Sequence, residues 1–172
     1  MSEALRAALL EFDGKALSYL SETSLRFKQA PDYLETLVGL AGDRAAHIDN
    51  GATWLIKDHL EKGGAQAPEL VAPLLKQLTT EPSWPAALHI LQSVRRVDLT
   101  GARDTAAFDA MKAYADHPRP FLRAWAMDAM WRMAHAFPDL QADARRAIGT
   151  GLNDKAASVR ARARQLSKEA CE

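Results

Sequence analysis

Cysteine, long apolar runs and a secretion signal are the features that this sequence has least of. Its 172 residues include one cysteine, Cys171, so no disulfide can form within the chain. No apolar run approaches the ~20 residues of a membrane-spanning helix. The first residues lack the basic segment followed by an apolar segment that marks a secretion signal. Because reducing compartments keep thiols free, we expect a cytoplasmic protein with no membrane partner.

An excess of charge of one sign is also missing. Twenty-two Lys and Arg residues balance twenty-two Asp and Glu residues, so no net field attracts nucleic acid or a membrane. The balance is uneven along the chain, because residues 119–168 carry eight Arg and two Lys against four Asp, a net charge of +6. This segment is interpreted either as a solvated helix face or as a surface that contacts phosphate groups.

Motifs for catalysis, cofactors and metals are absent too. The chain has no glycine-rich phosphate loop, no cysteine placed for nucleophilic attack and no Ser-His-Asp order. Its five histidines form no i, i+4 pair with an acidic partner, the spacing of a helical metal site. Asp128, which lies near two tryptophans, could act as a general base, but nothing else in the sequence supports that role. We therefore predict a non-enzyme with no catalytic residue, metal or cofactor.

What the sequence does contain is a period of about 37 residues after Pro31. One row of apolar residues recurs at intervals of 37: Leu37, Leu74, Met111 and Ile148. Three further rows share spacings of 36, 38 and 37: Ile48, Trp84, Leu122 and Val159; Ala52, Leu88, Ala126 and Ala163; Leu55, Leu91, Ala129 and Leu166. Rows that keep one register along the chain indicate tandem repeats.

Each period reads as two helices joined by a polar turn, and no segment shows the alternation of a strand. The sequence therefore predicts an all-α fold in one domain, 1–172. Neither helix of a pair can bury its apolar stripe alone, so the pairs should stack into a continuous core. We expect a short right-handed α-solenoid of antiparallel helix pairs, with an N-terminal hairpin cap at 1–30 and four repeats at 31–64, 65–101, 102–138 and 139–172.

The repeats resemble HEAT repeats, which have a turn aspartate, a second helix that opens with Val-Arg, a small residue three positions on and a leucine three after that. The best match is the last unit, with Asp154, Val159-Arg160, Ala163 and Leu166, and the third unit follows with Asp116, Leu122-Arg123 and Ala126. The first unit has Asp49 where the family favours arginine, and the second, with Trp84-Pro85, departs most.

The resemblance implies that turn aspartates and helix-opening arginines pair between neighbouring repeats. The candidate members of this ladder are Asp43, Asp116, Asp154, Arg123 and Arg160. Asp49 and Pro85 should interrupt it. HEAT-type arrays serve as scaffolds, adaptors and regulatory subunits, and one group of DNA glycosylases is built from similar repeats, so the resemblance speaks for fold more than for function.

The second helix of each pair should line the concave face, so its positions outside the core rows are the candidate ligand contacts. Either flank of these helices could be the exposed one. The candidate residues are Asn50, Lys57, His89, Gln92, Arg123, Trp125, Asp128, Trp131 and Arg132. Trp84 falls in a core row, and Trp125 is expected to be mainly a packing residue. Trp131 lies at a flank position and is the aromatic residue that we most expect to be exposed. The polar last helix should cap the array, which favours a monomer.

Two functions follow from this interpretation. The first is a non-catalytic protein-interaction or scaffold module, which binds a peptide or helix of a partner protein along the concave face. The alternative is a DNA-binding or DNA-repair protein that resembles HEAT-like DNA glycosylases. Trp125, Asp128 and Trp131 echo the tryptophans and aspartate that such glycosylases use, and the basic segment 119–168 would supply phosphate contacts.

Overall fold

The computed structural model describes residues 1–65 and 67–170. Within these residues the chain forms helices and no strand, so the predicted all-α class is confirmed. The described helices include none that is both long and apolar enough to cross a membrane. Cys171 lies outside the described residues.

In residues 1–65 and 67–170 ten α-helices follow one another, two in each of the five predicted units. They are α1 (Ser2–Leu10), α2 (Leu17–Phe27), α3 (Tyr33–Leu40), α4 (Ile48–Glu61), α5 (Pro68–Lys76), α6 (Trp84–Ser93), α7 (Thr105–Ala115), α8 (Pro120–Ala136), α9 (Gln141–Leu152) and α10 (Ala157–Glu169). The described part of the chain also forms short 3-10 helices at Gln77–Thr80 (η1), Val94–Arg96 (η2) and Pro138–Leu140 (η3).

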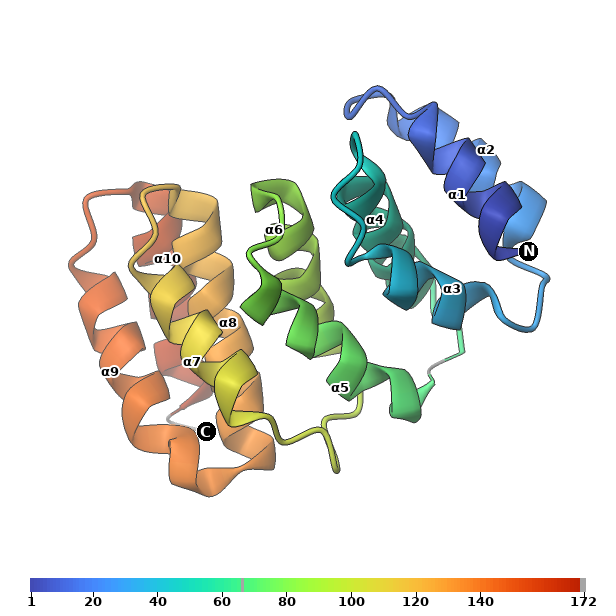
Figure 1. Cartoon of the computed structure of the whole chain (residues 1–172). Helices are drawn as coiled ribbons and strands as arrows, with labels where there is room; N and C mark the ends of the chain where they lie inside the picture. Colours follow the sequence, from blue (N-terminus) through green and yellow to red (C-terminus); the bar gives the residue numbers. More distant parts are fainter. Residues whose placement is uncertain (66, 171–172) are drawn as a thin grey trace.

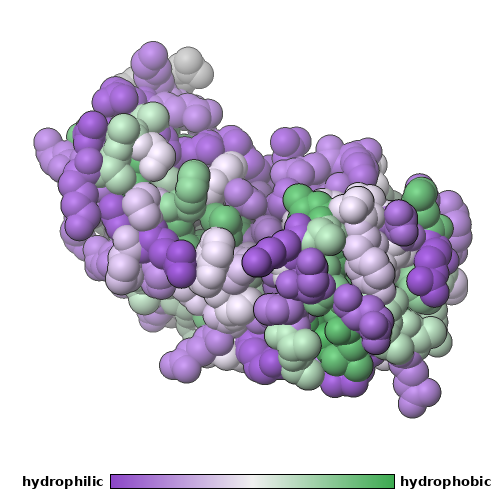
Figure 2. Space-filling model, turned by 90° about the horizontal axis from the view of Figure 1, so that it is seen from above, coloured by the Kyte–Doolittle hydropathy of each residue, from purple (hydrophilic) through white to green (hydrophobic). Residues whose placement is uncertain are grey.

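The helices form an elongated array, with α1 and α2 at one end and α9 and α10 at the other (Figure 1). The second helices pack in sequence, α4 against α6, α6 against α8 and α8 against α10. Helices α6, α8 and α10 all begin near the upper edge in Figure 1. Seen from above, the molecule is mostly hydrophilic, with hydrophobic groups in several separate places (Figure 2).

The periodic apolar rows form the core almost as predicted. The row of the first helices is buried throughout: Leu37, Leu74, Met111 and Ile148 are at most 5% exposed. Of the second-helix rows, Leu88 is only partly buried, and Trp84 is 45% exposed, so its prediction as a core residue is wrong. Because α6 begins at Trp84, the side chain stands at the end of the helix, where the Arg119 guanidinium lies 4.4 Å from its ring centroid.

Helix α8 is enclosed by four other helices, because α6, α7, α9 and α10 all pack against it. Eleven of its seventeen residues are buried, and Phe121 in its first turn is the large hydrophobic side chain that it exposes, at 63%. The face of α8 that was predicted to line an open groove is therefore mostly covered.

The predicted ladder of ion pairs forms in part. Arg123 makes two 2.8 Å contacts with the Asp154 carboxylate in the next turn, and this pairing lowers the pKa of Asp154. Arg160 instead donates to the backbone carbonyls of Asp154 and Lys155. Asp116 has no ion pair within the described part of the chain. Asp43 pairs at 2.7 Å with Arg6 of α1, which ties the N-terminal hairpin to the array.

Candidate binding site around Asp128

Asp128 lies in the middle of α8 with no exposed surface. Three arginines from three parts of the chain surround its carboxylate. Arg162 of α10 donates through Nη1 to Oδ2 at 3.1 Å. The Nε atoms of Arg132, on α8, and Arg95, in η2, lie 3.5 and 3.7 Å from Oδ1. A charge buried without partners would be very costly, and these arginines supply the partners.

Trp125 lies three residues before Asp128 and hence on the same side of α8. The Cζ atom of Arg162 lies 4.1 Å from the centroid of its ring, and that of Arg95 lies 5.7 Å away. Guanidinium groups at these distances are attracted by the ring face. We call Arg95, Arg132 and Arg162 around Asp128, together with Trp125, the arginine cluster.

A second carboxylate closes one side of the arginine cluster. Glu169 accepts a 2.6 Å bond from Nη2 of Arg132, and Gln165 links Glu169 to Arg162 through contacts of 3.4 and 3.3 Å. Three guanidinium groups thus face two carboxylates, so the site keeps one positive charge. A site with this balance attracts a negatively charged ligand.

Hydrogen-bond donors in the arginine cluster outnumber the acceptors that they meet. The 3.7 Å approach of Arg95 to Asp128 is too long for a hydrogen bond, and the Arg95 side chain is 26% exposed. Oδ1 of Asp128, Nε of Arg132 and Nε1 of Trp131 are buried without a hydrogen-bond partner. Buried polar atoms of this kind are rare in proteins and call for an explanation.

The arginines shield the Asp128 carboxylate, which the sequence suggested as a general base. Both carboxylate oxygens face arginine side chains and the residue has no exposed surface, so a substrate could reach the carboxylate only if these arginines moved. In the described arrangement, the partly exposed residues of this cluster are the arginines and Trp125.

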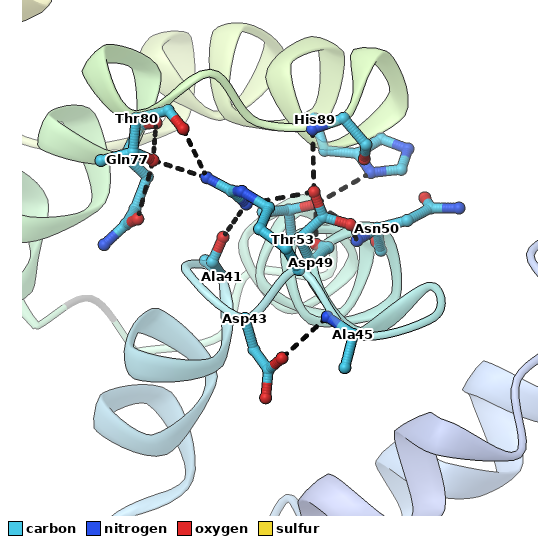
Figure 3. Close-up of polar contacts among 11 residues, drawn as sticks. Ala41, Asp43, Ala45, Asp49, Asn50, Thr53, Gln77, Thr80 and His89 are labelled. Carbon is cyan, nitrogen blue, oxygen red and sulfur yellow. Dashed lines mark hydrogen bonds and ion pairs between the residues drawn. The ribbon is translucent and has the colours of Figure 1, made fainter.

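A second polar cluster joins α4 to α6 around Asp49 (Figure 3). The Asp49 side chain, 4% exposed, accepts at 2.7 Å from the backbone N–H of Asn50 and at 2.8 Å from that of Ser83, while Arg44 donates to it at 3.1 Å. Ser83 directly precedes α6, so the Asp49 carboxylate bonds one helix pair to the next.

Thr53 and His89 form part of the same junction, with Oγ1 of Thr53 3.2 Å from Nδ1 of His89. Burial lowers the pKa of His89 to about 4, and the charge of Lys57 acts in the same direction. His89 is therefore a neutral hydrogen-bonding group at pH 7 and adds no charge to this surface.

The structure separates the nine predicted contact residues into two groups. Asn50, Arg123, Asp128 and Trp131 are at most 8% exposed, so their predicted exposure on a concave face is wrong. The neighbouring helices cover them, and Trp131 in particular is 3% exposed. The partly exposed residues are Lys57, which pairs with Glu61 at 2.9 Å, His89, Gln92, Trp125 and Arg132. The structure brings Trp125, Asp128 and Arg132 together in the arginine cluster.

Sequence reasoning missed Arg95 and Arg162. A signal for Arg162 was present, because it falls 37 residues after Trp125, which is the spacing of the predicted period. Arg95 lies beyond the end of α6, in the 3-10 turn η2, where a register extended from the helix does not apply.

Comparisons of the chain with protein-family models, characterised proteins and solved structures give no match.

Proposed function

We propose that this protein is a non-catalytic binding module of HEAT-like helical repeats, and that its arginine cluster holds an acidic segment of a partner protein. The observation that carries the proposal is the convergence of three arginines on one buried carboxylate, with a net positive charge and one face of a tryptophan beside them. Tryptophan and arginine are the residues most enriched where binding energy concentrates in protein interfaces.

The flank of α8 extends this site towards the end of the helix. Phe121, Trp125 and Arg132 are spaced at i, i+4 and i+11, so they follow one side of α8. Phe121 is 63% exposed, Trp125 is partly buried and the Arg132 side chain is 25% exposed. A peptide or helix that lies along this flank can place an apolar side chain on Phe121 and an acidic one at the arginines.

A second candidate is the binding of nucleic acid, which the charge of +6 on residues 119–168 favours. The whole chain, however, has no net charge, and several cations of this segment are paired with carboxylates inside the chain. Arg123 pairs with Asp154, Arg146 with Asp143 and Arg132 with Glu169. Paired cations release few counterions on binding phosphates, and for this reason we place the protein partner first.

The test is a selection from a displayed library of random 12-residue peptides, followed by affinity measurements on the enriched sequences. We expect enrichment of Asp and Glu near an apolar residue, and at least about tenfold weaker binding by an Arg95→Gln/Arg162→Gln double variant. The control is Arg146→Gln, which removes a cation whose side chain is 74% exposed on another helix. Peptides that bind wild type and double variant equally would overturn the proposal.

The same proteins, titrated with a labelled single-stranded oligonucleotide, test the second candidate. Nucleic acid would be favoured if the oligonucleotide bound more tightly than every selected peptide and if its affinity fell steeply with salt. Circular dichroism of each variant checks that the helices remain folded.

A further inference from the structure

The arginine cluster has more unused hydrogen-bond donors than one carboxylate can accept. A guanidinium group carries five N–H donors. The described contacts use one nitrogen of Arg162 and one of Arg132 in hydrogen bonds to the residues around them, and Arg95 makes no hydrogen bond with Asp128 at 3.7 Å. Apart from the buried Nε of Arg132, the remaining donors lie on side chains that are 18–26% exposed.

From this surplus we propose that the acidic group recognised here is a phosphate monoester, carried by a phosphorylated serine, threonine or tyrosine of the partner. The proposal rests on the proposed function of the same site. A phosphoryl group has three strong acceptor oxygens and a charge of about −1.5 to −2 at pH 7. It can accept from Arg95 and Arg162 together, and its charge offsets the positive charge that Asp128 and Glu169 leave.

Glu169 and Asp128 show how many hydrogen bonds a carboxylate accepts from the arginines of this site. Glu169 hydrogen-bonds to one arginine, Arg132. Asp128, although enclosed by three arginines, accepts a hydrogen bond from Arg162 and leaves Oδ1 without a partner. At this site each carboxylate therefore accepts hydrogen bonds from one guanidinium group, whereas the three acceptor oxygens of a phosphoryl group can accept from two.

The surroundings favour a phosphorylated peptide over a nucleic acid. Two carboxylates stand in the site itself, and each lowers the affinity for a chain of closely spaced phosphates. A single phosphoryl group needs only the few unpaired donors of Arg95 and Arg162. The exposed Phe121 on the same flank offers contact to an apolar side chain near the modified residue.

The experiment compares three peptide libraries that differ only at a fixed central residue: phosphoserine, glutamate or serine. Binding of each library to the full chain is measured by fluorescence anisotropy at two salt concentrations. We expect the phosphoserine library to bind at least about tenfold more tightly than the glutamate library, with this preference lost in Arg95→Gln/Arg162→Gln and retained in Arg146→Gln. Arg162→Lys keeps the charge but not the planar fork, and we expect it to lose most of the preference.

The outcomes separate the two proposals. Equal binding of the phosphoserine and glutamate libraries, with loss in the double variant, overturns the phosphate inference and leaves the acidic-segment function standing. Weak and equal binding of all three libraries overturns both. If a labelled oligonucleotide binds more tightly than the phosphoserine library, the arginine donors serve nucleic acid, and the phosphate-monoester inference is overturned.

Discussion

Asp49 and Asp128 are two buried aspartates in second helices, but they are held in opposite ways. Asp49 accepts from two backbone N–H groups, those of Asn50 and Ser83, as well as from Arg44. Asp128 meets arginine side chains, and its Oδ1 has no hydrogen-bond partner. Backbone donors are fixed by the fold, whereas arginine side chains can turn towards water or towards a ligand.

Asp49 and Arg123 occupy corresponding positions near the start of α4 and α8, and both link one helix pair to the next. At the equivalent position of the third unit, Arg123 donates to Asp154 in the turn that precedes the next second helix. Asp49 also reaches that turn in its neighbour, but as an acceptor from the Ser83 N–H. The link between neighbouring helix pairs is kept with its polarity reversed, so Asp49 is a structural residue.

Removal of the Asp49 carboxylate should therefore give the largest loss of stability. We expect Asp49→Ala to lower the free energy of unfolding by about 3–5 kcal/mol, because buried donors on two helix pairs lose their acceptor. Urea unfolding followed by circular dichroism measures this. The control is Asp139→Ala, which breaks an exposed pair with Arg103 and should cost at most about 1 kcal/mol. A loss no larger than that of the control would contradict the prediction, because the hydrogen bonds of Asp49 would then contribute no more than an exposed ion pair.

His89 should make the Asp49 junction sensitive to acid. Its pKa is about 4 in the folded protein, against ~6.5 in an unfolded chain. Between these values unfolding takes up a proton, so the free energy of unfolding falls as the pH falls. The loss from pH 7 to pH 4 should reach about 3 kcal/mol.

The measurement is urea unfolding at several pH values for wild type and His89→Gln. The difference between their free energies of unfolding isolates His89 from the carboxylates, several of which also have lowered pKa values. We expect this difference to change by about 3 kcal/mol between pH 7 and pH 4. If the difference stayed constant across this range, the pKa of His89 would be the same in the folded and the unfolded chain, and the prediction would be wrong.

Gly51 tests the packing of α4 against the N-terminal hairpin. A Cβ atom at Gly51 would lie 2.8 Å from Leu9 Cδ2 and 3.3 Å from both Leu20 and Phe12. We expect Gly51→Ala to cost about 2 kcal/mol through overpacking. Gly149→Ala is the matched control, since no atom lies within 4 Å of its added Cβ, and it should stabilise the helix by about 0.5–1 kcal/mol. Equal effects at the two sites would mean that α1 and α2 are loosely attached.

The apolar rows predicted the helix pairs because burial depends on spacing along one helix, which the sequence displays directly. The exposure of the second helices depends on how many neighbours enclose each of them. Four helices pack against α8, and a period of about 37 residues carries no information on that number, so Trp131 was expected at the surface. Trp84 fits the period, but its side chain is exposed because it stands at the first residue of α6. The sequence could not predict the whole arginine cluster, because Arg95 follows the end of α6, where the register of the helix no longer applies.

Asp128→Asn should give the smallest loss of stability, although Asp128 is the more deeply buried of the two aspartates. Asparagine keeps the shape without leaving a buried charge unpaired, and the three arginines, with side chains 18–26% exposed, can turn to water. We expect a loss of about 1 kcal/mol, well below that of Asp49→Ala in the same urea experiment. The variant also raises the net charge of the site by one, so an acidic peptide should bind at least as well as to wild type. A loss as large as that at Asp49, with peptide binding unchanged, would make Asp128 a second structural junction and remove the difference between the two regions.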